Sequence, residues 1–347
     1  MLGGGVFVTQ NKVLPGSYIN FVNTTTTNGA LGERGVVAIV LPIGKTPGKV
    51  IELTKVEFYS DSETILGVKS DDAKVAPLRE IFIHSNKVYI YDLGGETELT
   101  VSDALESLEP YEFNVICAYT NDSTATKAYI EKVIEWRDTL GKKCQVVVYN
   151  DAGTTKHEGV INVVSTIEGG EITHALTAWV AGIEAACPVN KSCTNALYDG
   201  EYEVVTDKTQ AELEECINNG QLVFHKVYGE IRLLEDINTL VDFTEDKGED
   251  FRYNQTIRVL DQIANDISKL FNTKYIGNIP NNAAGRTSFW GDIVAHHKQL
   301  ESINAIEKFD SSLLSVEQGA TKKSIVVKDA ITVINSMTQL YMTVVVK

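Results

Sequence analysis

Short apolar runs and helically spaced apolar residues alternate through the middle of the chain. Residues 113–119 and 144–149 are almost continuously apolar, which is typical of strands that are buried on both faces. Between them, residues 124–140 carry apolar side chains at helical spacing, and Gly141 follows as a stop signal. This succession predicts a strand–helix–strand unit within an α/β fold.

Further elements follow before residue 245. Helical spacing predicts helices at residues 172–186 and 207–218, the first ending before Pro188 and the second before Gly220. Residues 222–227 and 230–234 then read as a hairpin. The middle of the chain is therefore predicted to be an α/β domain.

The region before this unit has a different pattern. Residues 35–41, 49–53 and 88–91 are short β-like runs, separated by Gly-Lys and Pro-Gly punctuation. The pattern predicts a small β-rich domain at residues 30–92.

The region after the unit begins with an acidic joint at residues 244–250. An amphipathic helix is predicted at residues 251–271 and a second helix at residues 287–303. Strands are predicted at residues 324–327 and 331–334. Together they predict a third, C-terminal α/β domain.

Both ends of the chain carry a strand that stands apart from these domains. Near the start the strand consists of Tyr18, Ile19, Asn20, Phe21 and Val22, and a polar run at residues 23–29 follows it as an extended tether. At the other end, Leu340, Met342, Val344 and Val346 alternate with Tyr341, Thr343 and Val345. An apolar strand at a chain end must pair with something, because an unpaired one is an aggregation template.

Two ways of pairing these strands are open. Each strand either pairs within its own chain or adds to the sheet of a neighbouring subunit. We favour the intermolecular reading for both and more strongly for the C-terminal strand. The predicted organisation is therefore an arm and linker at residues 1–29, the domains 30–92, 93–245 and 246–337, and a strand arm at residues 338–347.

Charge and cysteine content narrow the classes of partner. The formal net charge is −16, so nucleic acid and anionic membrane surfaces are not expected to bind. No apolar run reaches the length of a membrane span, and no signal peptide is expected at the N-terminus. An odd number of cysteines, five, predicts reduced thiols rather than a disulfide framework.

A search for catalytic motifs gives no site. The turn after residue 119 lacks the glycines of a dinucleotide fold, and no P-loop or nucleophile elbow occurs. The neighbours His296 and His297 point about 100° apart on a helix, so a shared metal is not expected and solvated or hydrogen-bonded side chains are. We predict no catalytic, metal or cofactor site. The alternatives are an α/β enzyme with an unrecognised site around Asp151 or His296, and a soluble binding module.

Four patches of sequence, in order along the chain, match one known family. They are Pro15-Gly16-Ser17-Tyr18-Ile19-Asn20-Phe21, residues 32–38 with 41–44, residues 251–271 with 275–277 and 281–282, and residues 337–344. Each resembles the corresponding segment of the contractile tail sheath proteins of phages and phage-tail-like bacteriocins.

The resemblance implies a fold and a function. It implies three domains, of which the middle one has a subtilisin-like topology but no protease site, since the nucleophile context is missing. It implies a structural subunit that polymerises with itself as a helical tube and contracts while strand arms link neighbours. The implied partners are the inner tail tube, baseplate and tail terminator proteins, in a virion tail or tail-like particle that is assembled in the bacterial cytoplasm.

Overall fold

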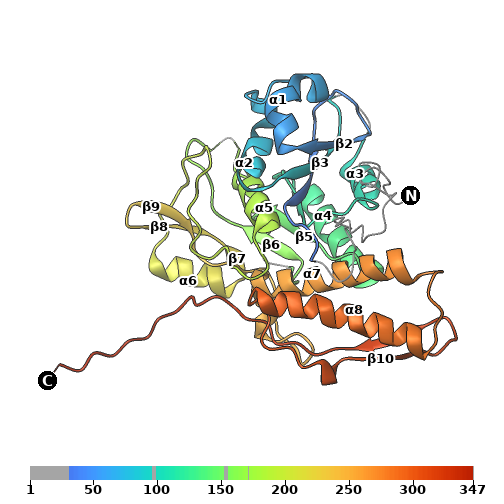
Figure 1. Cartoon of the computed structure of the whole chain (residues 1–347). Helices are drawn as coiled ribbons and strands as arrows, with labels where there is room; N and C mark the ends of the chain where they lie inside the picture. Colours follow the sequence, from blue (N-terminus) through green and yellow to red (C-terminus); the bar gives the residue numbers. More distant parts are fainter. Residues whose placement is uncertain (1–30, 96–98, 152–154, 171, 347) are drawn as a thin grey trace, which may run out of the picture.

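The computed structural model describes residues 31–95, 99–151, 155–170 and 172–346. A seven-stranded sheet with helices on both faces forms the larger part, and a layer of two long helices and a hairpin lies against one end of it (Figure 1). The predicted α/β class is confirmed.

The large sheet has the strand order β2-β3-β1-β4-β5-β6-β7. Strand β2 pairs antiparallel with β3, and the other neighbours are parallel. The strands are β1 (Val36–Leu41), β2 (Val50–Thr54), β3 (Lys87–Asp92), β4 (Val115–Cys117), β5 (Gln145–Tyr149), β6 (Val160–Val163) and β7 (Gln221–Leu222).

The first region is part of this sheet rather than a sheet of its own. Strand β1 is apolar along its whole length, so both of its faces need cover, and it lies between β3 and β4 with Ile39 opposite Ile90 and Cys117. The strands of the predicted β-rich domain at residues 30–92 therefore share one sheet with those of the middle region. The same region also contains the helices α1 (Lys55–Leu66) and α2 (Ala76–His84).

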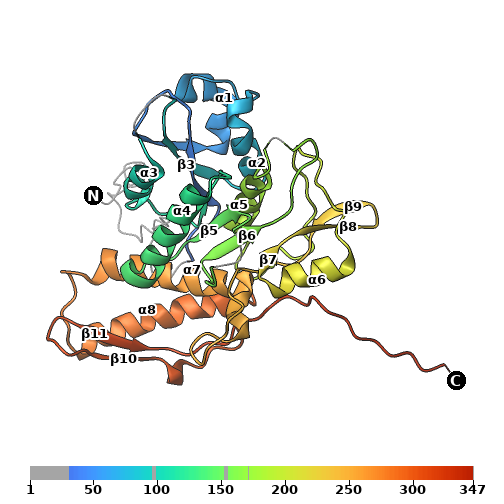
Figure 2. The same cartoon turned by 180° about the vertical axis from the view of Figure 1, so that it is seen from behind.

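Two apolar cores lie on the two faces of the sheet. Residues of α1, α2 and α5 (Leu176–Ala186) pack on one face, and residues of α3 (Val101–Leu108) and α4 (Ser123–Glu135) pack on the other (Figure 2). A π-helical turn at Trp136–Leu140 extends α4 to the predicted end before Gly141. The sheet and the helices on its two faces thus form three layers, and the apolar residues of the sheet are buried between them.

The C-terminal part is built on α7 (Asn254–Leu270) and α8 (Ala283–Ser302), which run side by side (Figures 1 and 2). The hairpin of β10 (Ser315–Gln318) and β11 (Ile325–Lys328) packs against α8 and completes a third, smaller core. The predicted helix at 251–271 is confirmed as α7, and the predicted strand at 324–327 as β11.

Other predicted elements shift or disappear. The predicted helices 172–186 and 207–218 begin later, as α5 and as α6 (Gln210–Asn218), and the predicted hairpin is β8 (Phe224–Val227) with β9 (Glu230–Leu233). The strand predicted at 331–334 is wrong, because only one isolated bridge, from Val333 to Ile306, forms there. Among the helices of the described ranges, none combines the length and apolarity that crossing a membrane needs.

Candidate functional site

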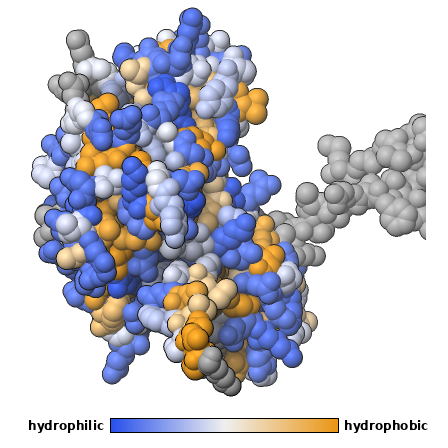
Figure 3. All heavy atoms as spheres, turned by 90° about the vertical axis from the view of Figure 1, so that its left-hand side faces the viewer, coloured by the Kyte–Doolittle hydropathy of each residue, from blue (hydrophilic) through white to orange (hydrophobic). Residues whose placement is uncertain are grey.

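The C-terminal arm is the most unusual surface feature of the described chain. After residue 336 the backbone leaves the globular part and runs outwards, and no described strand pairs with it (Figure 1). Leu340 is 85% exposed and Val346 is 90% exposed. Figure 3, seen from the side towards which the arm projects, shows hydrophobic residues gathered at the lower end of this face. Contiguous apolar residues that face water are typical of surfaces that bind a partner.

Only one of the two predicted arms lies within the described residues. The described part of the C-terminal arm includes Leu340, Tyr341, Met342, Thr343, Val344, Val345 and Val346, all exposed and none in a ladder. The predicted N-terminal strand, Tyr18 to Val22, lies outside the described residues. Within the described residues, the C-terminal arm therefore has no intrachain strand partner.

The root of the C-terminal arm is fixed to the start of α7. Gln255 donates from Nε2 to the carbonyl of Ile334 at 3.1 Å and accepts from the amide of Ser336 at 2.9 Å. Thr256 donates from Oγ1 to the side-chain oxygen of Asn335 at 3.2 Å. The arm thus leaves from a hydrogen-bonded anchor, and the free part begins directly after it.

The first described residues of the chain are held by the same two helices. The amide of Gly32 donates to both carboxylate oxygens of Asp266 on α7, at 3.1 Å each. The amide of Leu31 donates to Gln299 of α8 at 3.3 Å. A side chain at Gly32 would collide with Asp266, since a Cβ there would lie 2.5 Å from Oδ1. Both chain segments that lead to the predicted arms are therefore anchored on α7 and α8.

Several strand edges are open to an added strand. In the large sheet β2 and β7 are the outer strands, and the hairpins β8–β9 and β10–β11 have two strands each. The apolar side chains of Val326 and Val327 in β11 are exposed, at 46% and 38%. A two-stranded sheet is marginally stable alone, so a further strand would stabilise it. We therefore regard β10–β11 as the better acceptor among these edges.

A buried ionic junction connects the large sheet to the C-terminal helices. Arg258 of α7 donates to Asp236 at 2.8 Å and lies 3.3 Å from Glu184 of α5, and all three side chains are 1% exposed. Burial alone would lower the pKa of Arg258, but Asp236 and Glu184 raise it well above its usual value. Burial and then the charge of Asp236 raise the pKa of Glu184 well above its usual value. The positive charge of the guanidinium thus offsets the desolvation cost of burying the two carboxyl groups.

A second junction lies nearby. Arg137 makes a bidentate pair with Asp261 of α7, at 2.6 and 2.9 Å, and both side chains are largely buried. The pKa of Arg137, which burial would lower, is raised by Asp261. Two arginine–carboxylate contacts therefore fix α7 against the sheet domain.

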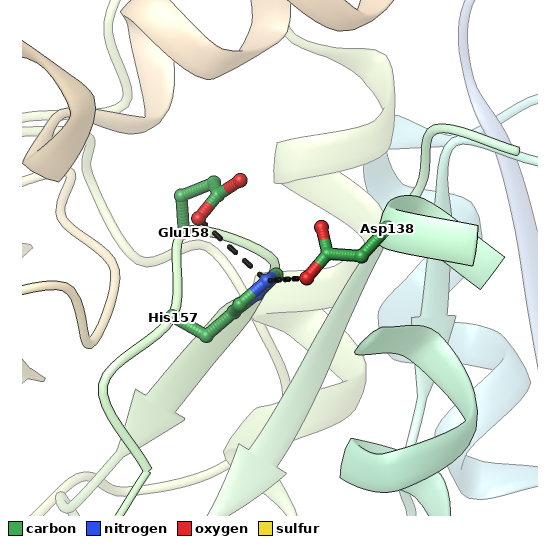
Figure 4. Close-up of side chains that lie close together, drawn as sticks. All are labelled: Asp138, His157 and Glu158. Atoms are coloured by element: carbon green, nitrogen blue, oxygen red, sulfur yellow. Dashed lines mark hydrogen bonds and ion pairs between the residues drawn. The ribbon is translucent and has the colours of Figure 1, made fainter. Parts of the chain in front are cut away.

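The acid–histidine cluster beside this junction does not fit a metal ion. Figure 4 shows His157 between Asp138 and Glu158, with Nε2 at 3.2 Å from Asp138 and 3.7 Å from Glu158. Nδ1 accepts the amide proton of Gly159 at 3.0 Å, so the ring proton of the neutral imidazole lies on Nε2 and blocks a ligand bond there. Glu158 also takes Lys247 on both oxygens, at 2.8 and 2.9 Å. Burial lowers the pKa of His157, which favours this neutral form.

The other cluster of possible metal ligands, Glu184, Cys193 and Asp236, already holds a cation. Arg258 lies among them, and its Nη2 is 3.6 Å from the sulfur of Cys193 and 2.8 Å from Asp236. A divalent ion would have to displace this guanidinium. The donor set therefore fits an arginine rather than a metal.

The two positions that we considered for an unrecognised enzyme site have different surroundings. Asp151 follows β5 and exchanges hydrogen bonds with Asn162, as a turn residue would. His296 is 1% exposed and sits inside a hydrogen-bonded cluster. The expectation that His296 and His297 are hydrogen-bonded is confirmed, whereas the alternative that their side chains are solvated is wrong. The rings also meet, since 100° on a helix does not separate two long side chains that lean towards each other.

The comparisons with known families cover most of the chain. The model of the phage tail sheath protein central domain matches residues 94–239, and that of the phage tail sheath C-terminal domain matches residues 246–347. The tail sheath protein of Clostridium phage phiCD119 is 28% identical over 307 residues, covering 85% of this chain and 81% of that protein. The uncharacterized protein YqbK of Bacillus subtilis is 34% identical over 188 residues, which are 51% of this chain but only 40% of YqbK.

Solved structures share the fold at lower identity. A sheath tail protein from Desulfitobacterium hafniense superposes with a TM-score of 0.78 and 24% identity, covering 94% of this chain and 99% of its own. The contracted helical sheath of the anti-feeding prophage gives a TM-score of 0.69 with 14% identity, covering 96% and 99%.

Proposed function

The chain belongs to the phage tail sheath family, and from this premise we propose that it is the structural subunit of a contractile tail sheath. In this proposal it polymerises with itself as a helical tube around an inner tail tube, and it catalyses no reaction. The particle is a virion tail or a tail-like particle assembled in the bacterial cytoplasm. Baseplate and tail terminator proteins bind the ends of the tube, and the inner tube protein binds its inside.

One observation carries this proposal beyond family membership: the exposed apolar arm that follows a fixed root. A strand that leaves its own domain and pairs with a neighbour makes a head-to-tail contact, and such contacts that do not close produce helical filaments. Each backbone hydrogen bond contributes about 1 kcal/mol net, so an arm of this length contributes several kcal/mol per subunit. The covered apolar side chains add to this.

The hairpin β10–β11 is the acceptor that we propose for this arm. Its edge carries Val326 and Val327, whose exposed side chains match the apolar character of the arm. Pairing there would join residues 338–347 of one subunit to the C-terminal domain of the next. Contraction then repacks the domain surfaces, while the backbone ladders and their anchors on α7 stay intact.

The strand arm can be tested with proline. Thr343→Pro removes one backbone N–H and fixes φ, so a ladder through residue 343 is broken, whereas Thr343→Ala keeps the ladder. We expect long hollow tubes from the intact chain and from Thr343→Ala in negative-stain electron microscopy, and few or none from Thr343→Pro. Because residue 343 is exposed and contacts no core, the melting temperature of the unassembled subunit should be the same in all three.

The outcomes separate the two parts of the proposal. Tubes from Thr343→Pro that match those of the intact chain would remove the arm from assembly and leave the sheath function standing. Uniform small particles from the intact chain at high concentration would contradict the sheath function itself.

A further inference from the structure

Four side chains form a continuous polar relay that runs from α7 through α8 to the segment after β11. Asp266 lies 2.9 Å from Nε2 of His296, the two Nδ1 atoms of His296 and His297 are 3.3 Å apart, and Nε2 of His297 lies 2.6 Å from Asp329. The imidazoles are 1% and 0% exposed. Asp266 and Asp329 are thus joined through two buried rings, and no solvent is needed between them.

The three contacts of the relay need more protons than two neutral imidazoles carry. Each of the three contacts joins two atoms with lone pairs, so each needs one proton between them to be attractive. Two neutral imidazoles supply only two protons. Asp266 already accepts hydrogen bonds from Gly32, Gln262 and His296, which identifies it as the ionised carboxylate. The third proton must therefore come from solution and reside between the two rings or between His297 and Asp329.

We propose that His296, His297 and Asp329 form a proton-binding site that holds one proton more than two neutral histidines would carry. With two carboxylates and one extra proton, the relay has a net charge of −1. Without that proton one contact becomes a repulsion between lone pairs in a buried site, which is costly because no water can replace the lost hydrogen bond.

The surroundings of the rings agree with this count. The charged partners that the described structure gives to the imidazoles are both acidic: Asp266 from α7 and Asp329 from the segment after β11. The ring of Phe309, from the loop after α8, packs edge-on against His297 at 4.7 Å between centroids. The two carboxylates attract an added proton, and the apolar ring offers no hydrogen bond that could replace it.

The relay also connects the two anchors described above. Asp266 at one end binds the amide of Gly32, and Asp329 at the other end lies five residues before Ile334, where the root of the C-terminal arm binds α7. Loss of the proton would weaken the contact that holds Asp329 and loosen the segment between β11 and the arm. This inference concerns the interior of one subunit, so it stands or falls independently of the proposed function.

The test compares the full chain with Asp329→Asn. An asparagine at 329 donates an N–H to Nε2 of His297, so the three contacts are satisfied by the two protons of neutral imidazoles and no extra proton is required. The unassembled subunit should be used for both, with unfolding by denaturant at a series of pH values between 7 and 9. Other groups that titrate in this range are the same in both chains and cancel in the comparison.

The sign of the expected effect follows from proton linkage. In this range the unfolded histidines are neutral, so the folded intact chain binds one proton more than the unfolded one, and its stability falls as pH rises. One proton corresponds to an increase of the unfolding equilibrium constant by up to about tenfold per pH unit, relative to Asp329→Asn. Equal pH dependence of the two chains would overturn the proposal.

A second readout does not depend on the stability of the variant. We expect nitrogen-detected NMR of the intact chain at pH 7.5 to show three protons in the relay. Two are N–H protons fixed on the ring nitrogens of His296 and His297. The third is shared, either on a ring nitrogen or in the contact with Asp329. Two ring protons and no third would contradict the count. Stabilisation that a chelator removes would show that a divalent metal, bridging the Nδ1 atoms, takes the place of the proton, and would equally overturn the proposal.

Discussion

The large sheet and the C-terminal layer differ in how completely their apolar side chains are buried. In the sheet, β1 and its neighbours are covered on both faces, and the helices α2, α4 and α5 complete two cores. In the C-terminal layer, α7 and α8 close a smaller core, but β11 leaves Val326 exposed and the arm leaves Leu340 to Val346 uncovered. The sheet region thus buries most of its apolar residues in two closed cores, while the C-terminal layer leaves a continuous row of them exposed in the arm.

This difference separates the residues that stabilise the folded subunit from those that are available for assembly. The free energy that keeps the subunit folded comes mainly from the closed cores of the sheet, because it scales with apolar area removed from water within one chain. In the assembly that we propose, the free energy of association comes from the surfaces that the C-terminal layer still exposes. Changes in the two regions should therefore separate subunit stability from tube formation.

The largest expected effect on stability is at the junction between the two regions. Arg258→Met leaves Glu184 and Asp236 buried without a counter-charge, so the free energy of unfolding should fall by about 3–5 kcal/mol. Arg232→Met is the matched control, since Arg232 pairs with the exposed Glu230 and should cost about 0–1 kcal/mol. Chemical denaturation of both variants measures the difference; equal losses would show that the junction does not couple the regions.

A smaller effect is expected from the acidic joint. Lys247 binds both oxygens of Glu158, and although burial would raise the pKa of Glu158, this contact and His157 keep it below its usual value. A lowered pKa stabilises the folded state above the unfolded pKa of about 4.3, and this stability is lost as pH falls through the folded value.

Lys247→Gln should therefore lose less stability than the intact chain between pH 5 and pH 3. The difference should be at most about 1 kcal/mol, since Lys247 is partly exposed and solvent screens the pair. Lys127→Gln, which removes an exposed pair with Glu131, is the control. If the free energy of unfolding falls equally with pH in the intact chain and in Lys247→Gln, the acidic joint does not contribute to linking the two regions.

Elements with a strong local pattern could be predicted from the sequence. The apolar runs gave β1 and β5, and the helical spacing gave α4 and α7, because the buried face of each is recorded in its own residues. Helix α1 was missed because Val56 and Tyr59 are exposed and blur the amphipathic pattern. The capping box of Thr54 and Glu57 at its start was a local signal that would have indicated it.

Features that depend on distant contacts could not be predicted. The joining of β1 and β4 crosses the predicted boundary at residue 92, and no local pattern says which strand a central strand will pair with. The relay unites Asp266, His296 and Asp329 across 63 residues of chain (329 − 266). The arm, in contrast, was predicted as a strand signal because its alternation is local, whereas its partner is not encoded in that segment.

The most direct test of the assembly account is hydrogen exchange of the arm amides in the free subunit and in assembled tubes. In the free subunit, the amides of residues 340–346 should exchange at the rate of an unstructured chain, since no described strand pairs with them. In tubes, alternate amides of the arm and the amides at the open edge of β11 should become protected together. Arm amides that exchange as fast in tubes as in the free subunit would contradict the claim that this strand links neighbouring subunits.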